Sequence, residues 1–198
     1  MCSGKSTVAD ALVQHYGYSR LSIASPIKLL AECARASAFE YATHILELIC
    51  PPGTKLSALA GRYTTLCETH DAELSSGAKP RAFLQDLGLE LRDYDEDIWI
   101  NALLRRAADA ETPVVVDDLR YWNEAVALRR SHWTLLRCYA NEATLRARRK
   151  QLYPGMDVTR LDHPSEHALD DWDWTNVVST TSDVTLLPQY LGRLIGAQ

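Results

Sequence analysis

The sequence predicts an α/β fold in which helices flank a parallel sheet, and two segments carry this prediction. Residues 1–7, MCSGKST, match the second half of a phosphate-binding loop that leads into a helix. Residues 113–118, PVVVDD, form an apolar run that ends in two acids, which is typical of a buried parallel strand whose carboxyl end meets a site. Strands alternate with helices around these segments, and right-handed crossovers then make the sheet parallel.

Helices are expected to dominate the first half of the chain. Apolar residues recur there at three- and four-residue spacing, and Gly17, Pro26 and the run Pro51-Pro52-Gly53 mark helix ends. The expected elements are a helix over 7–16, a strand over 18–23, a helix from 26 to near 50, a short helix near 55–66 and helices from 80 and 98. The stretch over 51–79 is the least regular, and we expect an exposed insertion there.

The second half alternates more evenly between strands and helices. The expected strands cover 113–118, 132–138 and 175–178, and the expected helices cover 123–130, an Arg-rich segment from 141, and 184–195. Tyr153-Pro154-Gly155 breaks the Arg-rich helix, and a polar segment then runs to His167.

Composition argues against several classes of function. The chain of 198 residues has a formal net charge of -5 and a pI near 5.7, which argues against a broad nucleic-acid-binding face. It has no apolar run of about 18 residues and no charged-then-apolar leader, so we expect neither a membrane span nor a secretion signal. Five cysteines without a C-x-x-C pair indicate reduced thiols, and we expect a cytoplasmic protein.

The phosphate-binding loop is incomplete in this chain. Gly4, Lys5 and Ser6 fill the last three places of G-x-x-x-x-G-K-[ST], in which backbone N–H groups cradle phosphates, the Lys reaches the β- and γ-oxygens and the hydroxyl ligates Mg²⁺. The first loop glycine would fall two positions before Met1, so we expect the native chain to begin further upstream with a strand. The alternative is a chance match at the start of an ordinary helix.

Two acids end the predicted strand over 113–118. A nucleoside-triphosphate site needs a carboxylate at this place for Mg²⁺ or for the attacking oxygen, and Asp117 and Asp118 both qualify. Either acid could instead cap the helix that follows. Arg120 comes two residues after the acids and is expected at the same crevice beyond the strand ends.

Two basic groups are candidates for contacts with phosphate. Arg81, Gln85 and Arg92 share one face of a predicted helix, where guanidinium groups can clamp a monophosphate and the amide can read a base edge. Residues 146–150 hold the densest basic cluster just before a Gly and Pro break, and a hinged Arg-bearing segment suits phosphoryl transfer. The alternative for both groups is a solvated helix surface.

Five segments occur in order between residues 2 and 171 and support a family resemblance together. They read CSGKSTVADAL, LSIASPIK, RAFLQDLG, VVVDDLRYWNEA and DHPSEHALDD. Each is modest alone, but five in this order resemble the bacteriophage deoxynucleoside monophosphate kinase family. The resemblance implies a single P-loop kinase domain with a core over 1–30 and 110–198, a nucleoside-monophosphate-binding insertion over about 31–109, a lid over about 146–168 and a first strand upstream of residue 1.

The resemblance also implies an activity, which moves the γ-phosphoryl group of ATP to a deoxynucleoside monophosphate with Mg²⁺. By position, the residues expected to contact ATP are Ser3, Gly4, Lys5, Ser6 and Thr7, with Ser6 and Asp118 on the metal. Those expected to contact the acceptor are Arg81, Gln85, Arg92, Arg120, Glu124 and Glu166, the last of which matches the family's H-P-S-E element together with His163 and Ser165. Those expected to act in the transfer are Lys5, Asp118, Arg120, Arg146 and Arg149.

Two other interpretations remain open at this stage. Dephospho-coenzyme A kinase shares the loop, an acid-tipped strand and a basic lid, although the segment DHPSEHALDD favours the phage family. A non-catalytic nucleotide-binding module would explain the incomplete loop. Under the favoured interpretation the partners are ATP and a deoxynucleoside monophosphate, without a nucleic-acid polymer or a membrane, the location is the host cytoplasm for a phage gene, and a homodimer is one candidate assembly.

Overall fold

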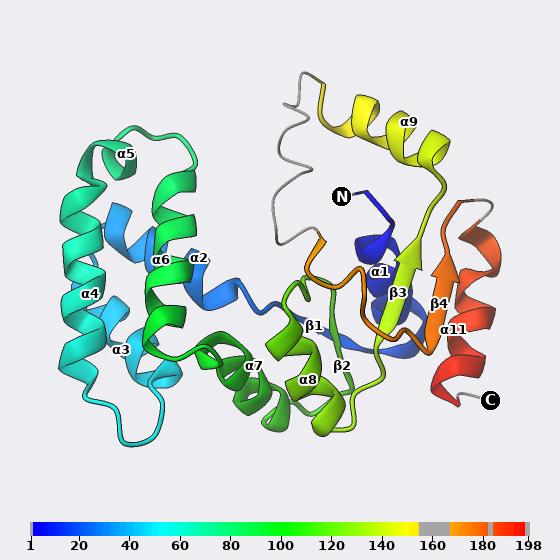
Figure 1. The fold of residues 1–198 in the computed structure, drawn as a ribbon, viewed down its shortest axis with the longest axis horizontal. Helices are drawn as coiled ribbons and strands as arrows, with labels where there is room; N and C mark the ends of the chain where they lie inside the picture. The colour runs from blue at the N-terminus through cyan, green and yellow to red at the C-terminus, as the bar shows by residue number, and fades with distance from the viewer. Residues whose placement is uncertain (1, 155–166, 182–183, 197–198) are drawn as a thin grey trace. The chain divides into compact units, whose positions relative to one another are not determined.

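The chain is a mixed α/β protein that is 61% helical and contains two small parallel sheets. The computed structural model describes residues 2–154, 167–181 and 184–196, and Figure 1 shows their secondary structure. The chain divides into two compact units. We call Met1–Leu21 with Ala110–Gln198 the α/β unit, and Ser22–Asp109 the helical unit. The helical unit thus begins nearer the N-terminus than residue 31, at which the sequence placed the insertion.

The helical unit consists of helices packed around a common apolar interior. Its helices are α2 (Ser25–Arg35), α3 (Phe39–Ile49), α4 (Leu56–Thr69), α5 (Asp71–Ser75), α6 (Arg81–Tyr94) and α7 (Ile98–Ala108). The largest side chains of the interior are almost wholly buried: Leu30, Leu46, Ile49, Leu59, Phe83, Leu87, Leu91, Ile98, Trp99, Ile100 and Leu103. Every helix except the short α5 buries apolar residues at helical spacing, as the sequence pattern predicted for most of them.

The single helix expected from residue 26 to near residue 50 is wrong, because the chain turns between α2 and α3. Ser37 has a φ of 52°, in the left-handed region, and the Ala38 N–H donates to the Cys33 carbonyl at 2.9 Å, which closes the end of α2. The turn lets α3 bury Ala42 and Leu46 against its neighbours. No Gly or Pro marks this break, so tertiary packing decides it.

The short helix expected near 55–66 is confirmed as the longer α4, but the irregular structure expected for the rest of 51–79 is wrong. Most of this stretch is helical, in α4 and α5, and Leu59 and Tyr63 are buried. The Tyr63 hydroxyl donates to the Leu30 carbonyl at 2.8 Å, so α4 is bound to α2 by a buried hydrogen bond. Burial raises the pKa of Tyr63 well above its ordinary value, which keeps this hydroxyl a donor.

The α/β unit contains the strands, all of which pair in parallel. Its elements are α1 (Lys5–Tyr16), β1 (Ser19–Leu21), β2 (Val114–Val116), α8 (Trp122–Arg130), β3 (Leu136–Tyr139), α9 (Glu142–Leu152), β4 (Asn176–Ser179), the 3-10 helix η2 (Val184–Leu186) and α11 (Leu187–Ile195). Strand β1 pairs with β2, with Ser19 opposite Val114, and β3 pairs with β4, with Leu136 opposite Asn176. Parallel pairing is therefore confirmed, but the described strands form two sheets instead of the one expected.

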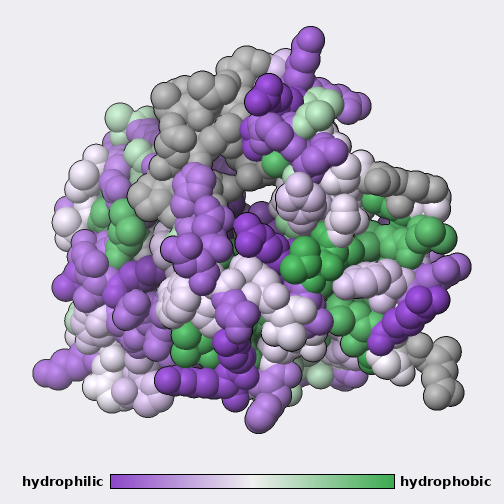
Figure 2. Space-filling view, turned by 45° about the vertical axis from the view of Figure 1, so that its right-hand side comes forward, coloured by the Kyte–Doolittle hydropathy of each residue, from purple (hydrophilic) through white to green (hydrophobic). Residues whose placement is uncertain are grey.

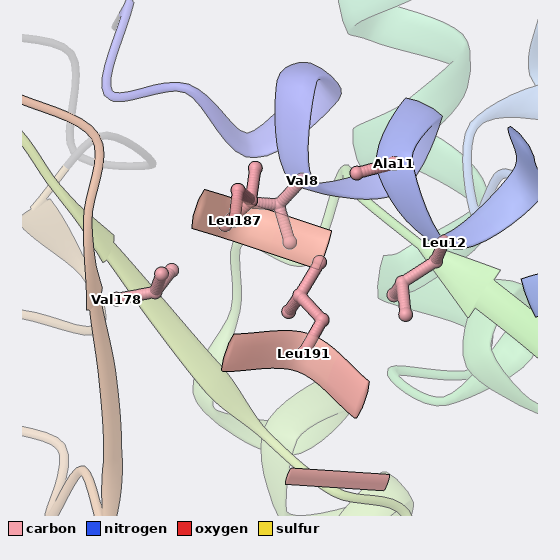
Figure 3. Packing of buried hydrophobic residues seen from close by; sticks show 6 residues of the cluster. All are labelled: Val8, Ala11, Leu12, Val178, Leu187 and Leu191. Carbon is pink, nitrogen blue, oxygen red and sulfur yellow. The ribbon is translucent and has the colours of Figure 1, made fainter. Parts of the chain in front are cut away.

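One apolar cluster joins the two sheets to the helices of this unit. Figure 3 shows its buried members, which come from α1, β4 and α11: Val8, Ala11, Leu12, Val178, Leu187 and Leu191. Val115 of β2 and Leu136 of β3 pack against the same cluster, so both sheets contact it. The packing brings the carboxyl ends of β2 and β4 to the start of α1, as the contacts of the loop described below show.

The β3–β4 sheet has one covered and one open face. Leu136, Cys138 and Val178 point to the apolar cluster, whereas Tyr139 and Val177 are about half exposed. Figure 2 brings the α/β unit forward and shows apolar patches on its surface. A parallel sheet buried on both faces would bury all of these side chains, so the alternation reflects the open face.

Truncation of the cluster should destabilise the α/β unit strongly. Leu191 is fully buried, and Leu191→Ala should lower the free energy of unfolding by about 2–5 kcal/mol through lost burial and a cavity. Urea unfolding followed by tryptophan fluorescence measures this change.

Leu186→Ala is the matched control, because Leu186 lies five residues earlier and is 63% exposed. The control should change the free energy of unfolding by no more than about 0.5 kcal/mol. Equal effects of the two substitutions would show that the cluster does not stabilise the unit.

Candidate functional site

The first turn of α1 presents backbone N–H groups without a side-chain acceptor. Gly4 precedes the helix in the left-handed conformation, with a φ of 86°, and within the described ranges no side chain accepts a hydrogen bond from the first-turn N–H groups. The first turn also contains no acidic residue. The free N–H groups and the helix dipole make this end of α1 attractive to an anion.

A pocket of about 120 Å³ lies beside the loop. Its basic side chains are Lys5, Arg120 and Arg137, and its acidic one is Asp170, which pairs with Arg137 at 3.7 Å. Lys5 is partly buried, and its side-chain ammonium makes no hydrogen bond or ion pair with another described residue. A cavity needs about 10–15 Å³ to hold one water, so the pocket has room for several waters or one small anion.

Asp117 is the acid that contacts the loop. The Ser6 hydroxyl donates to Asp117 Oδ2 at 2.8 Å, and the Arg20 guanidinium donates to both carboxylate oxygens, at 3.2 Å from Nε to Oδ1. Arg20 also pairs with Asp10 of α1 at 2.8 Å. The arginine therefore ties the carboxyl end of β2 to α1.

The electrostatics of this group keep Asp117 ionised. Burial raises the pKa of Asp117, but hydrogen bonds from Arg20 and Ser6 and the charge of Arg20 outweigh burial, so the pKa lies below its ordinary value. The same hydrogen bond to Asp117 raises the pKa of Arg20. A carboxylate and a hydroxyl oxygen thus lie together at the anion-attracting end of α1.

These oxygens suit a magnesium ion that arrives with a phosphate ligand. Mg²⁺ prefers oxygen ligands and is usually held by one or two carboxylates together with substrate phosphates and water. Ser6 and Asp117 supply such oxygens, and the part of the chain that the structure describes holds no cluster of three His, Cys, Asp or Glu side chains that could enclose a metal alone. The donor set therefore fits the expected cofactor. The sequence favoured Asp118 for this place, whereas Asp117 is the acid in contact with Ser6.

Glu124 lies beneath Arg120 and stabilises its backbone. Its carboxylate accepts from the N–H groups of Arg120 and Tyr121 at 3.0 and 3.1 Å, at the start of α8, and the side chain is 2% exposed. The resemblance placed Glu124 on the acceptor nucleotide. The structure gives it a supporting contact, since it fixes the backbone of a residue that lines the pocket.

The outer wall of the pocket is fixed on α8 by aromatic contacts. Trp172 packs edge-on against Trp122 of α8, with ring centroids 4.8 Å apart, and Arg129 lies over the Trp172 ring at 4.2 Å. Arg129 also donates to the Asp173 carbonyl at 2.9 Å. These contacts hold the segment that contributes Leu169, Asp170 and Trp174 to the pocket.

Cys138 of β3 forms part of the inner wall. Burial raises the pKa of its thiol to about 11, and the nearby charge of Lys5 opposes this shift only in part. The thiol is therefore neutral at physiological pH, and Cys138 adds no negative charge beside Lys5.

The arginines of α9 divide into two kinds. Arg146 is exposed and pairs with Glu142 at 3.0 Å, and Arg149 approaches the same carboxylate at 3.6 Å. Arg148 instead contacts the loop, because its Nη1 lies 3.3 Å from the Cys2 carbonyl. The sequence selected Arg146 and Arg149 for the lid and missed Arg148 as a loop contact. Glu166, His163 and Ser165 lie outside the described residues.

Three of the predicted acceptor residues, Arg81, Gln85 and Arg92, lie in the helical unit, on α6. Arg81 and Gln85 are exposed, and Arg92 is partly buried with its Nη1 3.5 Å from the Gly88 carbonyl. Gly88 lies between them on this face, and a Cβ there would meet Ile27 at 3.6 Å. The face is buried at Gly88, its centre, and carries two exposed polar side chains, Arg81 and Gln85, at its N-terminal end.

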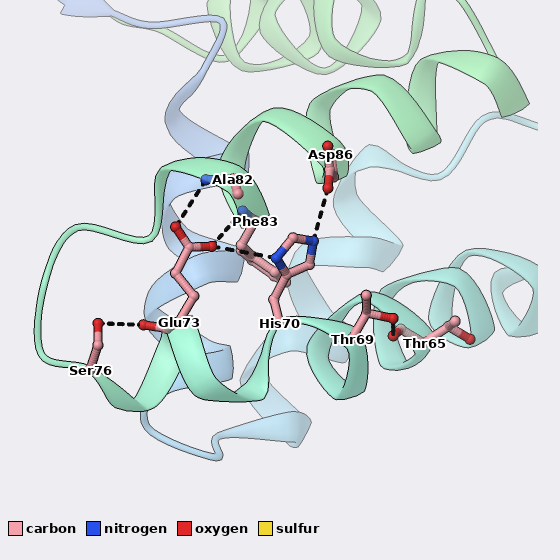
Figure 4. Close-up of polar contacts among 8 residues, drawn as sticks. All are labelled: Thr65, Thr69, His70, Glu73, Ser76, Ala82, Phe83 and Asp86. Atoms are coloured by element: carbon pink, nitrogen blue, oxygen red, sulfur yellow. Dashed lines mark hydrogen bonds and ion pairs between the residues drawn. The ribbon is translucent and has the colours of Figure 1, made fainter.

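A carboxylate occupies the N-terminus of α6, in contrast to α1. Figure 4 shows that Glu73 accepts from the N–H groups of Ala82 and Phe83 at 3.0 and 2.9 Å. His70 lies 3.4 Å from Glu73 and 2.9 Å from Asp86, and its ring packs edge-on against Phe83. The backbone hydrogen bonds, first that of Phe83, lower the pKa of Glu73. This capping network orients the turn from which Arg81 projects.

No family model matches the chain, and the search of curated proteins finds no match either. The geometry by itself describes an α/β protein with an electropositive helix N-terminus beside an ionised carboxylate.

The Glu73 cap should make the helical unit sensitive to acid. A carboxylate whose pKa is lowered by folding stabilises the protein above its unfolded-state pKa of about 4.3, and this stabilisation is lost as the pH falls through the folded-state pKa. Glu73→Gln should therefore unfold at a lower temperature at neutral pH and lose less stability on acidification than the wild type. Thermal unfolding by circular dichroism across pH 7 to about pH 3 measures both effects.

Glu47→Gln is the control for this substitution. Glu47 is exposed on α3, and its carboxylate makes no hydrogen bond or ion pair with a described residue, so the control should keep the wild-type profile. A wild-type acid profile in Glu73→Gln would rule out the cap as its cause.

Proposed function

We propose that the chain is a P-loop phosphotransferase that moves the γ-phosphoryl group of ATP to a deoxynucleoside monophosphate, giving ADP and the diphosphate. The observation that carries this proposal is Lys5. It lies at an uncapped helix N-terminus, lines a pocket with room for a small anion, has no partner among the described residues and is near the Ser6–Asp117 pair. A triphosphate is the ligand that uses all of these groups at once.

The donor nucleotide would bind at the start of α1. Backbone N–H groups of residues 4–7 and the Lys5 ammonium would contact its phosphates, with Ser3 and Arg120 in the pocket wall. Ser6 and Asp117 would hold Mg²⁺, which when bound neutralises charge on the triphosphate. Arg20 would keep Asp117 ionised and oriented.

The acceptor nucleotide is assigned from the family resemblance and from the side chains of α6. Arg81 and Gln85 project from a turn whose backbone Glu73 holds, and a guanidinium group can clamp a monophosphate through two hydrogen bonds. The Gln85 amide offers both a donor and an acceptor to a base edge. The choice of a deoxynucleotide over other phosphate acceptors rests on the sequence segments.

The transfer requires positioning and charge neutralisation and needs no strong base. An oxygen of the acceptor phosphate, already anionic near neutral pH, attacks the γ-phosphorus, and the bond from that phosphorus to the β–γ bridging oxygen breaks as ADP leaves. Lys5 and the arginines near the loop would stabilise the charge spread over the moving group. Water must be excluded from the site, because it competes as an acceptor.

The arrangement of the strands in a single P-loop kinase sheet is part of the same proposal. We infer that the β1–β2 and β3–β4 pairs are parts of one P-loop kinase sheet. Val115 of β2 and Leu136 of β3 pack on the same apolar cluster, which supports a common layer. The helical unit would then be the acceptor-binding insertion.

Removal of the Lys5 ammonium should abolish transfer and leave the fold intact. ADP formation from MgATP is measured with each of the four deoxynucleoside monophosphates, and Lys5→Ala should reduce the rate at least about 100-fold, because the charge acts on the transferring phosphoryl group. Lys55→Ala, at an exposed lysine of the helical unit, is the control and should keep the wild-type rate. Near-normal turnover in Lys5→Ala would overturn the proposal.

The same assay separates the two other interpretations. Transfer to dephospho-coenzyme A, with none to any deoxynucleotide, would indicate that class of kinase. Binding of MgATP in a calorimeter without transfer to any of the five acceptors would indicate a non-catalytic module.

Arg81 should act on acceptor binding more than on turnover. Arg81→Ala should raise the KM for the deoxynucleoside monophosphate roughly tenfold or more, because a charged hydrogen bond to phosphate is lost, with a smaller effect on kcat. Arg81→Lys keeps the positive charge but cannot make the two paired hydrogen bonds, so its KM should lie between those of the wild type and Arg81→Ala. An unchanged KM in Arg81→Ala would place the acceptor elsewhere.

A further inference from the structure

Two side chains from the C-terminal half of the chain hold the backbone of the phosphate-binding loop. Thr180 directly follows β4 and is fully buried, and its hydroxyl donates to the Ser3 carbonyl at 2.9 Å. Arg148 of α9 donates from Nη1 to the Thr180 hydroxyl at 3.1 Å and from Nη2 to the Thr180 carbonyl at 2.5 Å. With its contact to the Cys2 carbonyl, Arg148 completes a clasp around the loop.

The loop is also in close steric contact with Thr180. A Cβ at Gly4 would lie 2.6 Å from the Thr180 hydroxyl oxygen, so only glycine fits against it. Cys2 has a φ of 67°, a left-handed conformation that is unfavourable for a residue with a side chain. External contacts must therefore maintain this loop shape, and the clasp supplies them.

Within the described part of the chain, the Arg148 guanidinium forms no ion pair with a carboxylate. Its partners among the described residues are two carbonyls and one hydroxyl, whereas Arg146 and Arg149 on the same helix approach Glu142. Arg148 therefore adds positive potential at the loop as well as hydrogen bonds.

We propose that Thr180 and Arg148 are positioning residues, which fix the backbone of residues 2–4 so that the N–H groups of α1 and the Lys5 ammonium converge on one phosphate-binding point. The identity of the phosphate ligand rests on the proposed function, but the clasp does not. Neither residue needs to touch the reacting atoms. Both act through the loop, and Arg148 places α9 in direct contact with it.

Paired substitutions at adjacent threonines separate a positioning role from a general effect on stability. Thr180→Val keeps the shape and removes the hydroxyl, whereas Thr180→Ser keeps the hydroxyl. Thr181→Val is the matched control, because the Thr181 hydroxyl accepts from the Asn141 N–H at 2.9 Å and does not hold the loop.

Two measurements on the full chain read out the clasp. The first is hydrogen exchange of the N-terminal peptide without ligand, and the second is the affinity for MgATP and for inorganic tripolyphosphate. Thr180→Val should speed hydrogen exchange in the loop. It should also lower the affinity for each ligand roughly tenfold, as expected for a lost hydrogen bond at a charged site. Thr180→Ser and Thr181→Val should keep wild-type exchange and affinity.

Arg148→Lys provides a second test if Thr180→Val does not fold. It keeps the positive charge but cannot reach three acceptors at once, so loop exchange should speed up while tripolyphosphate affinity falls less than in Arg148→Met.

The outcomes distinguish the two proposals. Wild-type exchange and affinity in the clasp variants, or equal losses in Thr181→Val, would overturn the positioning role. If the wild type does not bind MgATP but hydrogen exchange in the loop is faster in Thr180→Val, the proposed function is refuted and the positioning role of the clasp is supported.

Discussion

The α/β unit depends on the apolar contact between α1 and α11. Each of its sheets has two strands of three or four residues, and a two-stranded sheet of this size is marginal by itself in water. Val8 and Leu12 of α1 and Leu191 of α11 provide the surface on which both sheets pack. Because α1 begins at Lys5, the packing that stabilises the unit also sets the position of the loop relative to the strand ends. Stability and site geometry therefore have one physical cause.

Charge pairing, more than composition, makes the site electropositive. The chain is acidic overall, yet Asp117, the carboxylate that contacts Ser6 of the loop, forms an ion pair with Arg20. Lys5 and Arg148 lack carboxylate partners among the described residues, and both lie near the start of α1. On α6, by contrast, Glu73 satisfies the N-terminal N–H groups. The N-terminus of α1 is thus prepared for an external anion, and that of α6 is closed by an internal one.

Local signals in the sequence predicted the elements around the site well. The expected helix over 7–16, strand over 113–118 and Arg-rich helix from 141 match α1 (Lys5–Tyr16), β2 (Val114–Val116) and α9 (Glu142–Leu152) to within two residues at the predicted ends. Parallel pairing followed from the alternation of strands and helices.

The contacts between distant elements could not be predicted in the same way. The rotation of α9 and the position of Thr180, 32 residues further along, decide that Arg148 and not its neighbours reaches the loop. The choice between Asp117 and Asp118 depends on how β2 leaves its sheet, which spacing does not encode. The left-handed Ser37 has no Gly or Pro signal, because burial of Ala42 and Leu46 determines that break.

The neutral Cys138 thiol has a consequence for the chemistry that the pocket tolerates. Oxidants and alkylating agents attack the thiolate, and a pKa of about 11 leaves very little thiolate at physiological pH. Cys138 therefore lines a lysine-containing pocket as a neutral side chain that reacts slowly with such agents at physiological pH.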